Sequence, residues 1–381
     1  MQCVHPASTE TLSLGDGRSI VLLEAIGRGS GGTVYRGSVE SGWGLRRTVA
    51  VKLLETSCET DHGEVMRRLG KIGRRAVNVR HPAVVQVFEV DRTEATKSKL
   101  AQPFIVSELV EGESLASLVT AWSSDGLRVP MDFAIVVATR TAEALGAALF
   151  SDSSDGTLTN LVHGDLSPRQ ILISSAGEVK VGDFGHGALR DASSHVRSRA
   201  RLAYTSPEVA RGAEPDARSD VFSLGVILHE LLIGPRFAAG TDMAEAVRMV
   251  RDGRIYQSLL EPNLPSSLRS VLDRAIERHP MNRYPHARAL AFDLRREMLR
   301  LGLVDAQTSV RHAVVGWCEV RGSEPLVMRF EETPRIASDI VPKMTDDDLD
   351  DLDGIEPAPE SEDTDPGAPF AIKASGQRRP R

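Results

Sequence analysis

The sequence predicts an α+β fold with two lobes, a small β-rich lobe followed by a larger helical one. Short apolar stretches with strand-like alternation dominate up to about residue 109. Longer apolar stretches with helical spacing dominate from residue 110 to about residue 302. The 381 residues are enough for one two-lobed domain of about 250–300 residues with extensions, and a cleft between the lobes is expected to hold a ligand.

The first lobe, residues 19–109, is expected to contain a sheet and one helix. The helix should run from Asp61 to about Val77, because His81-Pro82 prevents it from continuing. The predicted strands are Ile20–Ile26, Thr33–Ser38, Arg47–Leu54, Val84–Val90 and Phe104–Leu109. Residues 1–18 form an N-terminal extension in this division.

The second lobe, residues 110–302, is predicted to be mainly helical, with two short strands at Gln170–Ile173 and Val179–Val181. The predicted helices are Ser114–Ala121, Met131–Phe150, Ser206–Ala210, Asp220–Leu232, Met243–Asp252, Leu264–Arg278 and Ala287–Leu301. A C-terminal extension follows at residues 303–344, in which Ala313–Phe330 is expected to form two strands. Residues 345–381 are expected to be a disordered acidic tail.

Composition limits the class of protein. The three cysteines are far apart and give neither a disulfide framework nor metal-ligand spacing. The most apolar windows, Phe133–Phe150 and Val221–Ile233, contain charged residues and are interpreted as buried core helices and not as membrane segments. Without a signal-peptide pattern or a basic stripe for nucleic acid, we expect a soluble cytoplasmic protein.

The net charge of −7 comes from the tail, because residues 345–366 hold eleven acidic residues and no basic one. One interpretation is a solvated segment that aids solubility. The other is a pseudosubstrate or docking tail, attracted to a domain that is itself mildly basic.

A glycine-rich loop and a lysine carry the first chemical signal. Gly27, Gly29 and Gly32, followed by Val34, fit G-x-G-x-x-G-x-V between two strands, and glycines let backbone N–H groups approach phosphate oxygens. Lys52 ends the apolar alternation Val49-Ala50-Val51-Lys52 of its strand, eighteen residues after Val34. Alone it could be a solvent-exposed strand lysine, but after this loop it is a candidate phosphate ligand.

Three further motifs follow at matching distances. They are His163-Gly164-Asp165-Leu166-Ser167-Pro168-Arg169-Gln170, Asp183-Phe184-Gly185 and Ser206-Pro207-Glu208. With the loop and lysine, they resemble the eukaryotic-type serine/threonine protein kinases found in bacteria, from about Ile20 to Leu301. The resemblance implies a bilobal protein-kinase-like fold and phosphoryl transfer from ATP with Mg²⁺ or Mn²⁺ to a protein substrate in signalling.

The resemblance also implies individual roles. Asp165 would orient the substrate hydroxyl and accept its proton, Asp183 would hold the metal, and Lys52 would contact the phosphates. Val34, Ala50 and Leu172 would enclose the adenine, and Glu108 to Val110 would form the hinge, with Ser107 behind it. The structural residues would be His163 and Phe184 in the lobe interior, Asp220 in a buried helix, and Arg283 paired with Glu208.

The helix of the first lobe departs from the family pattern. The family places a glutamate, which pairs with the lysine, about nine residues before the His-Pro. Counting back from His81 gives Ile72, whereas Glu64 lies eight residues earlier, about 12 Å along a helix axis. Either the helix is shifted, the counted register is wrong, or Lys52 lacks this partner.

The catalytic loop departs at Gln170, Gly164 and Ser167, and the segment before Ser206 departs at Arg201. Gln170 replaces the metal-binding asparagine, which should weaken a second metal site. Gly164 replaces the arginine that usually receives an activation-loop phosphate. Ser167 and Arg201 stand where serine/threonine kinases place a lysine and a threonine, so our hypothesis is that Arg201 or Arg169 supplies the missing charge at the γ-phosphate.

These departures leave three hypotheses for function. The first is an active serine/threonine kinase, favoured because Lys52, Asp165 and Asp183 are all present. The second is a pseudokinase that binds nucleotide and acts through protein contacts. The third is a small-molecule phosphotransferase of the aminoglycoside or choline kinase kind, whose loop also has the sequence H-G-D but which generally lacks the Ser206-Pro207-Glu208 segment.

Overall fold

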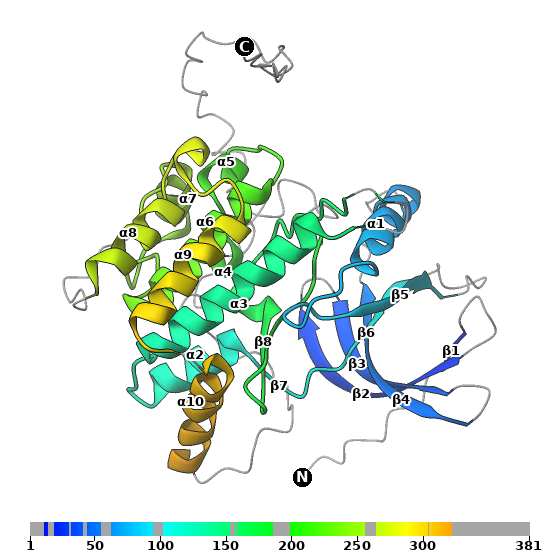
Figure 1. Ribbon diagram of the computed structural model, residues 1–381. Helices are drawn as coiled ribbons and strands as arrows, with labels where there is room; N and C mark the ends of the chain where they lie inside the picture. The colour runs from blue at the N-terminus through cyan, green and yellow to red at the C-terminus, as the bar shows by residue number, and fades with distance from the viewer. Residues whose placement is uncertain are drawn as a thin grey trace, which may run out of the picture. The chain divides into compact units, whose positions relative to one another are not determined.

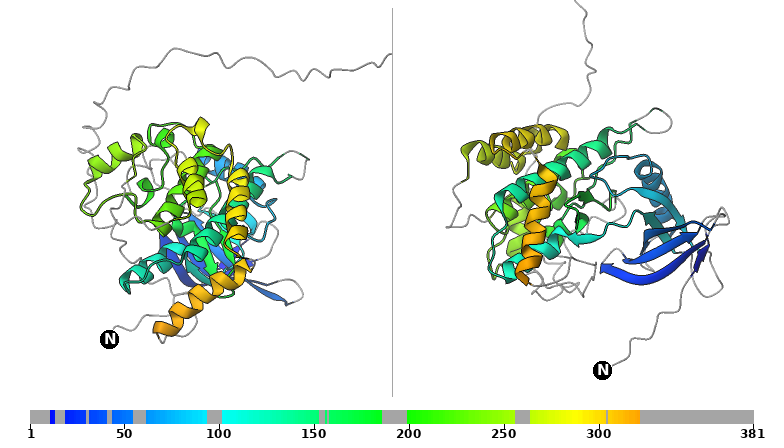
Figure 2. Two further views of the ribbon diagram at one scale, coloured as in Figure 1. Left: turned by 60° about the vertical axis from the view of Figure 1, so that its left-hand side comes forward. Right: turned by 60° about the horizontal axis from the view of Figure 1, so that its bottom comes forward.

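The computed structural model of the protein describes residues 11–13, 19–29, 32–40, 44–54, 62–93, 102–152, 156, 158–185, 199–255, 264–303 and 305–321. A sheet-containing lobe precedes a helical lobe, so the predicted two-lobed α+β fold is confirmed (Figures 1 and 2). The acidic tail expected at 345–381 lies outside the described residues.

The first lobe is built on a six-stranded antiparallel sheet with the strand order β1-β2-β3-β4-β6-β5. Its strands are β1 (Thr11–Ser13), β2 (Ser19–Gly29), β3 (Gly32–Glu40), β4 (Arg46–Leu54), β5 (Val87–Arg92) and β6 (Pro103–Ser107). Strand β1 lies within the predicted N-terminal extension and pairs with β2, so the sheet begins before residue 19.

One helix, α1 (His62–Ala76), accompanies this sheet (Figure 1). Its inward stripe contains Leu69, Ile72, Gly73 and Ala76, which have the spacing of one helical face. A Cβ added at Gly73 would lie 2.8 Å from Cγ2 of Val90. The missing side chain therefore lets α1 approach β5 closely.

The second lobe combines a three-stranded antiparallel sheet, in the order β7-β8-β9, with a helical core. The strands are β7 (Gly112–Ser114), β8 (Ile171–Ser174) and β9 (Val179–Val181). The helices are α2 (Leu115–Ser124), α3 (Met131–Phe150), α4 (Arg199–Leu202), α5 (Pro207–Ala210), α6 (Ala217–Leu232), α7 (Met243–Arg251), α8 (Ser266–Ala275) and α9 (Ala287–Arg300).

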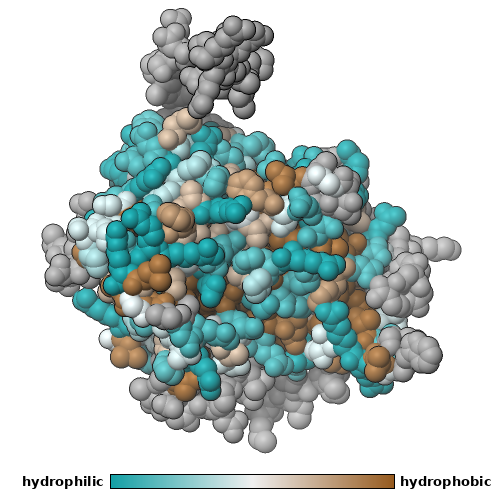
Figure 3. All heavy atoms as spheres, viewed as in Figure 1, coloured by the Kyte–Doolittle hydropathy of each residue, from teal (hydrophilic) through white to brown (hydrophobic). Residues whose placement is uncertain are grey.

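The core of this lobe lies around α3 and α6, which are buried along most of their length. Within the described part of the chain, α3 alone is long and apolar enough to cross a membrane by length and composition. However, 72% of its most apolar window is buried inside the protein. This agrees with the predicted core helix. On the face seen in Figure 3, hydrophobic side chains lie scattered among hydrophilic ones.

The strands expected between Ala313 and Phe330 are wrong as far as the structure describes that region. The chain instead forms helix α10 (Ala306–Arg321), and residues 322–330 lie outside the described part. Val310 and Val314 are buried in the core of the second lobe, four residues apart on one helical face. The i, i+4 apolar spacing therefore outweighs the β-branched residues that suggested strands.

Candidate active site

The glycine-rich loop joins β2 to β3, and Gly29 pairs with Gly32 at its base. Gly32 has φ +132°, and a Cβ there would lie 1.9 Å from the Leu53 carbonyl oxygen. Only glycine fits such an approach. The tip of the loop, residues 30 and 31, lies outside the described residues.

The strand register places the predicted nucleotide residues on one face of the sheet. Val34 lies opposite Lys52, and Ala50 lies opposite Ser107. Side chains at alternate positions point the same way, so Val34, Ala50 and Lys52 share a face, while Val49 and Val51 are buried on the other. The alternation in the sequence thus aims Lys52 away from the core of the sheet.

Lys52 joins the two lobes through Asp183. Lys52 Nζ lies 2.6 Å from Asp183 Oδ2, and the side chains are 15% and 36% exposed. Asp183 has φ +60°, a left-handed conformation that is uncommon for residues other than glycine. The pair brings two of the predicted catalytic charges into contact.

Ile72 is the residue of α1 that faces the Asp183-Phe184-Gly185 segment. A Cβ added at Gly185 would lie 2.6 Å from Cγ2 of Ile72. This contact agrees with the register counted from His81, so a shifted helix is not needed. An apolar side chain occupies the expected acid position, and the ion pair of Lys52 runs to Asp183.

The backbone of the catalytic loop is held by Asp220, at the start of α6. Its two carboxylate oxygens accept hydrogen bonds from His163 N at 2.8 Å and Gly164 N at 2.9 Å. Burial raises the pKa of Asp220. Gly164 has φ +74°, so glycine at this position avoids left-handed strain that an arginine would have to bear.

His163 and Phe184 pack against each other, with ring centroids 5.0 Å apart. His163 Nε2 lies 3.0 Å from the Gly182 carbonyl oxygen. These contacts tie the loop carrying Asp165 to the segment carrying Asp183. Both residues therefore take the interior packing role expected for them.

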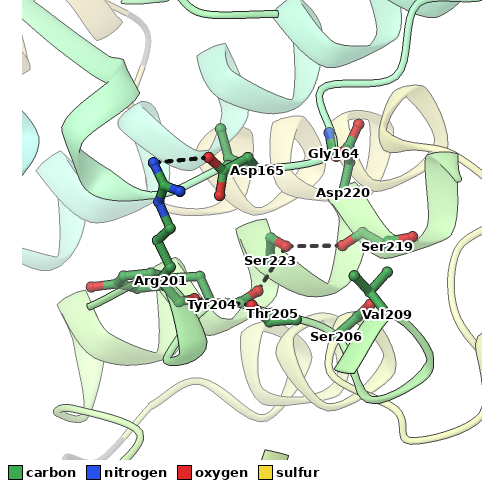
Figure 4. Close-up of a pocket in the computed structure, with 11 residues that line it drawn as sticks. Gly164, Asp165, Arg201, Tyr204, Thr205, Ser206, Val209, Ser219, Asp220 and Ser223 are labelled. Carbon is green, nitrogen blue, oxygen red and sulfur yellow. Dashed lines mark hydrogen bonds and ion pairs between the residues drawn. The ribbon is translucent and has the colours of Figure 1, made fainter. Parts of the chain in front are cut away.

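Asp165 lies beside Arg201, the residue in place of the family threonine. Arg201 Nη2 lies 3.5 Å from Asp165 Oδ2, and the side chains are only 17% and 9% exposed (Figure 4). Arg201 belongs to α4, at the end of the segment whose residues 186–198 lie outside the described part. A cation from this segment thus faces the candidate catalytic base.

A small, partly open hollow lies between the catalytic loop, α4, α5 and α6. Polar groups dominate its wall, and the guanidinium of Arg201 points across it toward Asp165 in Figure 4. The lining residues are Gly164, Asp165, Leu166, Arg201, Tyr204, Thr205, Ser206, Val209, Ser219, Asp220 and Ser223. This wall suits a polar ligand next to Asp165.

The Ser206-Pro207-Glu208 motif is anchored by the ion pair that the resemblance implied. Arg283 Nη1 and Nη2 donate to the two oxygens of Glu208 at 2.7 Å and 2.8 Å, and the Arg283 side chain is fully buried. Burial opposes ionisation of Glu208, but hydrogen bonds and charge from Arg283 hold its pKa below the ordinary value.

Comparison with known proteins identifies the family. The model of the protein tyrosine and serine/threonine kinases matches residues 20–294. The chain belongs to the protein kinase family.

A probable serine/threonine-protein kinase of Clostridium perfringens is 30% identical over 282 residues, which are 73% of this chain and 38% of that protein. Serine/threonine-protein kinase PknB of Mycobacterium leprae is 34% identical over 255 residues, or 66% of this chain and 39% of that protein. PknB of Mycobacterium tuberculosis is 34% identical over 256 residues, or 66% and 38%. The chain thus spans less than two fifths of these relatives' length.

Kinases of this family use ATP with a divalent metal, and the metal ligands implied here are Asp183 and Gln170. Asp183 fits, because Mg²⁺ prefers carboxylate oxygen and is commonly held by one or two protein ligands plus substrate phosphates. Gln170 fits less well. Its Oε1 accepts hydrogen bonds from Ser167 N at 2.9 Å and Ser167 Oγ at 2.6 Å. It would have to give up one of these bonds to bind a metal ion.

The remaining predicted residues lie along the kinase hinge and loop. Glu108 N donates to the Gln86 carbonyl oxygen, while Lys180 Nζ lies 3.0 Å from each Glu108 carboxylate oxygen. Val110 is buried, and Leu172 lies in β8. Arg169 lies in the 3₁₀ turn η1 (Pro168–Gln170). Contact between these residues and nucleotide stays a prediction.

Two further residues that shape this site stand outside the motifs recognised in the sequence. Lys180 fixes the Glu108 carboxylate, and its position three residues before Asp183 was the available signal. Arg236 donates to the carbonyl oxygens of Ala203 and Thr205, of which Thr205 lines the hollow. No local pattern around Arg236 points to this role, because its partners lie more than 30 residues away in the sequence.

Proposed function

We propose that this chain is an ATP-dependent protein kinase that transfers the γ-phosphoryl group to serine or threonine hydroxyls of a protein substrate. One observation carries the proposal: Lys52 and Asp183 form an ion pair from opposite lobes, and Asp165 lies on the same second lobe within a polar hollow. The family match and the names of the relatives support the same activity.

The residues would divide the work as phosphoryl transfer requires, by positioning and by neutralising charge. Lys52 and the glycine loop would hold the phosphates. Asp165 would orient the hydroxyl and accept its proton. Asp183 would hold a Mg²⁺ or Mn²⁺ ion, which would supply positive charge to offset that of the phosphates.

Arg201 is proposed as the cation at the γ-phosphate. Its guanidinium already lies beside Asp165, where hydroxyl and phosphoryl group would meet, and it carries a planar set of donors suited to phosphate. Ser167, which stands where the family lysine would be, is engaged with Gln170 instead. Arg201 can therefore take over a charge that the loop itself lacks.

Two observations favour the second candidate, a nucleotide-binding pseudokinase. Ile72 occupies the expected acid position, and Gln170 Oε1 is bound by Ser167. Both features would weaken the positioning of the phosphates and the binding of a second metal ion. Lys52 and Asp183 would still bind nucleotide. The two candidates differ in turnover, which is directly measurable.

The test incubates the purified chain with labelled ATP and either Mg²⁺ or Mn²⁺, beside an Asp165→Asn variant. We expect labelled phosphoserine or phosphothreonine on the protein or on a basic substrate protein, reduced about 10²–10⁴-fold by the substitution. Nucleotide binding without transfer in either metal would contradict the kinase proposal and support the pseudokinase. Label on a small molecule or on tyrosine would contradict the substrate class.

A further inference from the structure

Arg236 is a buried arginine in the loop between α6 and α7. It is 2% exposed and is among the largest fully buried side chains of the described residues. Its Nε donates to the Arg254 carbonyl oxygen at 3.2 Å. Its Nη1 donates to the carbonyl oxygens of Ala203 at 3.0 Å and Thr205 at 2.8 Å. One guanidinium therefore joins three segments of the chain.

The charge of Arg236 has no neutralising partner among the described residues. All its hydrogen-bond acceptors there are backbone carbonyl oxygens, and its buried Nη2 has no hydrogen-bond partner. The ring of Phe222, with its centroid 5.1 Å from Cζ, gives weak cation–π support. Burial, with a smaller contribution from the charge of Arg283, lowers the pKa of Arg236 to about 9. Burying such a group costs stability.

Arg236 holds the backbone segment from Arg201 to Thr205, which we call the strip. Arg236 binds the carbonyl oxygens of Ala203 and Thr205, and Ser223 Oγ donates to the one between them, on Tyr204, at 2.8 Å. The Arg201 carbonyl oxygen accepts hydrogen bonds from Tyr204 N and Thr205 Oγ1. The strip is thus a closed turn, and its position sets where Arg201 lies.

The strip also forms one wall of the hollow beside Asp165 (Figure 4). Phe237, next to Arg236, packs in one apolar cluster with Leu202 and Val247. Apolar packing already attaches α4 to α7 without any charge. The additional effect of Arg236 is to fix the carbonyl groups of the strip, and with them the guanidinium of Arg201.

We propose that Arg236 is a positioning residue for phosphoryl transfer: it fixes the strip from Arg201 to Thr205, so that Arg201 reaches Asp165 and the substrate segment meets an ordered wall. The inference rests on the proposed kinase function. A residue that only stabilised the fold would be better replaced by an apolar side chain of similar size, because buried charges commonly lower stability relative to such replacements. The geometry that Arg236 imposes gives this buried charge a role beyond stability.

The test compares Arg236→Met, which keeps an unbranched side chain and removes the charge and donors, with Arg236→Lys, which keeps a charge and three donors. For the methionine variant we expect a protein that stays folded at the assay temperature, an unchanged KM for ATP, and a kcat reduced about 10- to 100-fold. Lysine should restore part of the kcat. A wild-type kcat, or a loss of kcat that merely follows a loss of folded protein, would overturn the proposal.

Hydrogen exchange gives a readout independent of turnover. In Arg236→Met, the amides of Tyr204 and Thr205 should exchange faster, while amides within α3 and α9 keep their wild-type rates. If the wild-type chain transfers no phosphate, the kinase proposal fails, and the exchange measurement still decides whether Arg236 fixes the strip. Unchanged exchange at these amides would overturn the inference whatever the activity. If the methionine variant does not fold, the same two measurements on Arg236→Lys decide.

Discussion

The two candidate catalytic carboxylates each face a cation, but the two cations are positioned in different ways. Lys52 reaches Asp183 at 2.6 Å from the paired strand β4, whose register sets its direction. Arg201 reaches Asp165 at 3.5 Å from a turn whose carbonyl oxygens are bound by Arg236 and Ser223. Backbone pairing thus defines the first pair, and buried side chains define the second.

This contrast predicts that phosphoryl transfer falls most when Lys52, the cation beside Asp183, is removed. We expect Lys52→Met to reduce phosphoryl transfer about 10²–10³-fold, because it removes the lysine assigned to the phosphates. The measurement is kcat/KM for ATP, with Lys71→Met as the control, since Lys71 is exposed on α1 next to Ile72. Equal activity in the two variants would contradict the assignment of Lys52.

Loss of Arg201, the cation beside Asp165, should have a more moderate effect than loss of Lys52. The effect should appear only with a nucleotide that carries a γ-phosphate. Arg201→Thr should weaken ATP binding relative to ADP binding by roughly 10- to 100-fold, the strength of hydrogen bonds to a charged group. Calorimetry with both nucleotides measures the ratio without any turnover.

A second substitution sharpens the same comparison. Adding Ser167→Lys to Arg201→Thr restores the residue types that serine/threonine kinases place at these two positions. We expect it to recover most of the lost preference for ATP. A ratio that does not change in Arg201→Thr, or a double variant no better than the single one, would show that Arg201 does not contact the γ-phosphate.

The smallest expected effect concerns the metal. Gln170 Oε1 is bound by Ser167 in the wild type. In Gln170→Asn the side chain is one methylene shorter and no longer reaches Ser167, so its amide oxygen becomes available to a metal ion. The substitution should strengthen metal binding by about the free energy of one neutral hydrogen bond. The Mg²⁺ concentration needed for half-maximal nucleotide binding should therefore fall roughly two- to tenfold. An increase in that concentration would mean that the Ser167 contact supports the site.

Much of this architecture follows from local sequence patterns. Alternation at Val49 to Lys52 gave the strand and its face, and glycines at 27, 29 and 32 gave the hairpin. The order of motifs gave the family, and counting from His81 gave the helix position of Ile72. Each of these depends on the spacing of residues within one element or between neighbouring elements.

Other features depended on contacts between distant segments. The sequence offered Arg169 or Arg201 as the cation at the γ-phosphate, and only the path of the chain through α4 shows that Arg201 lies beside Asp165. The residues around 313 suggested strands, but burial of Val310 and Val314 on the second lobe favours a helix.

The sequence by itself therefore determined the lobes, the motif positions and the residues that carry charge, because strand and helix periodicity are encoded locally. The tertiary structure decided which charges meet: Lys52 with Asp183, Arg201 with Asp165, and Arg236 with the carbonyl oxygens of the strip. The physical reason is that an ion pair or a buried hydrogen bond depends on distances of a few ångströms between segments far apart in the chain, and these distances are set by the packing of whole elements.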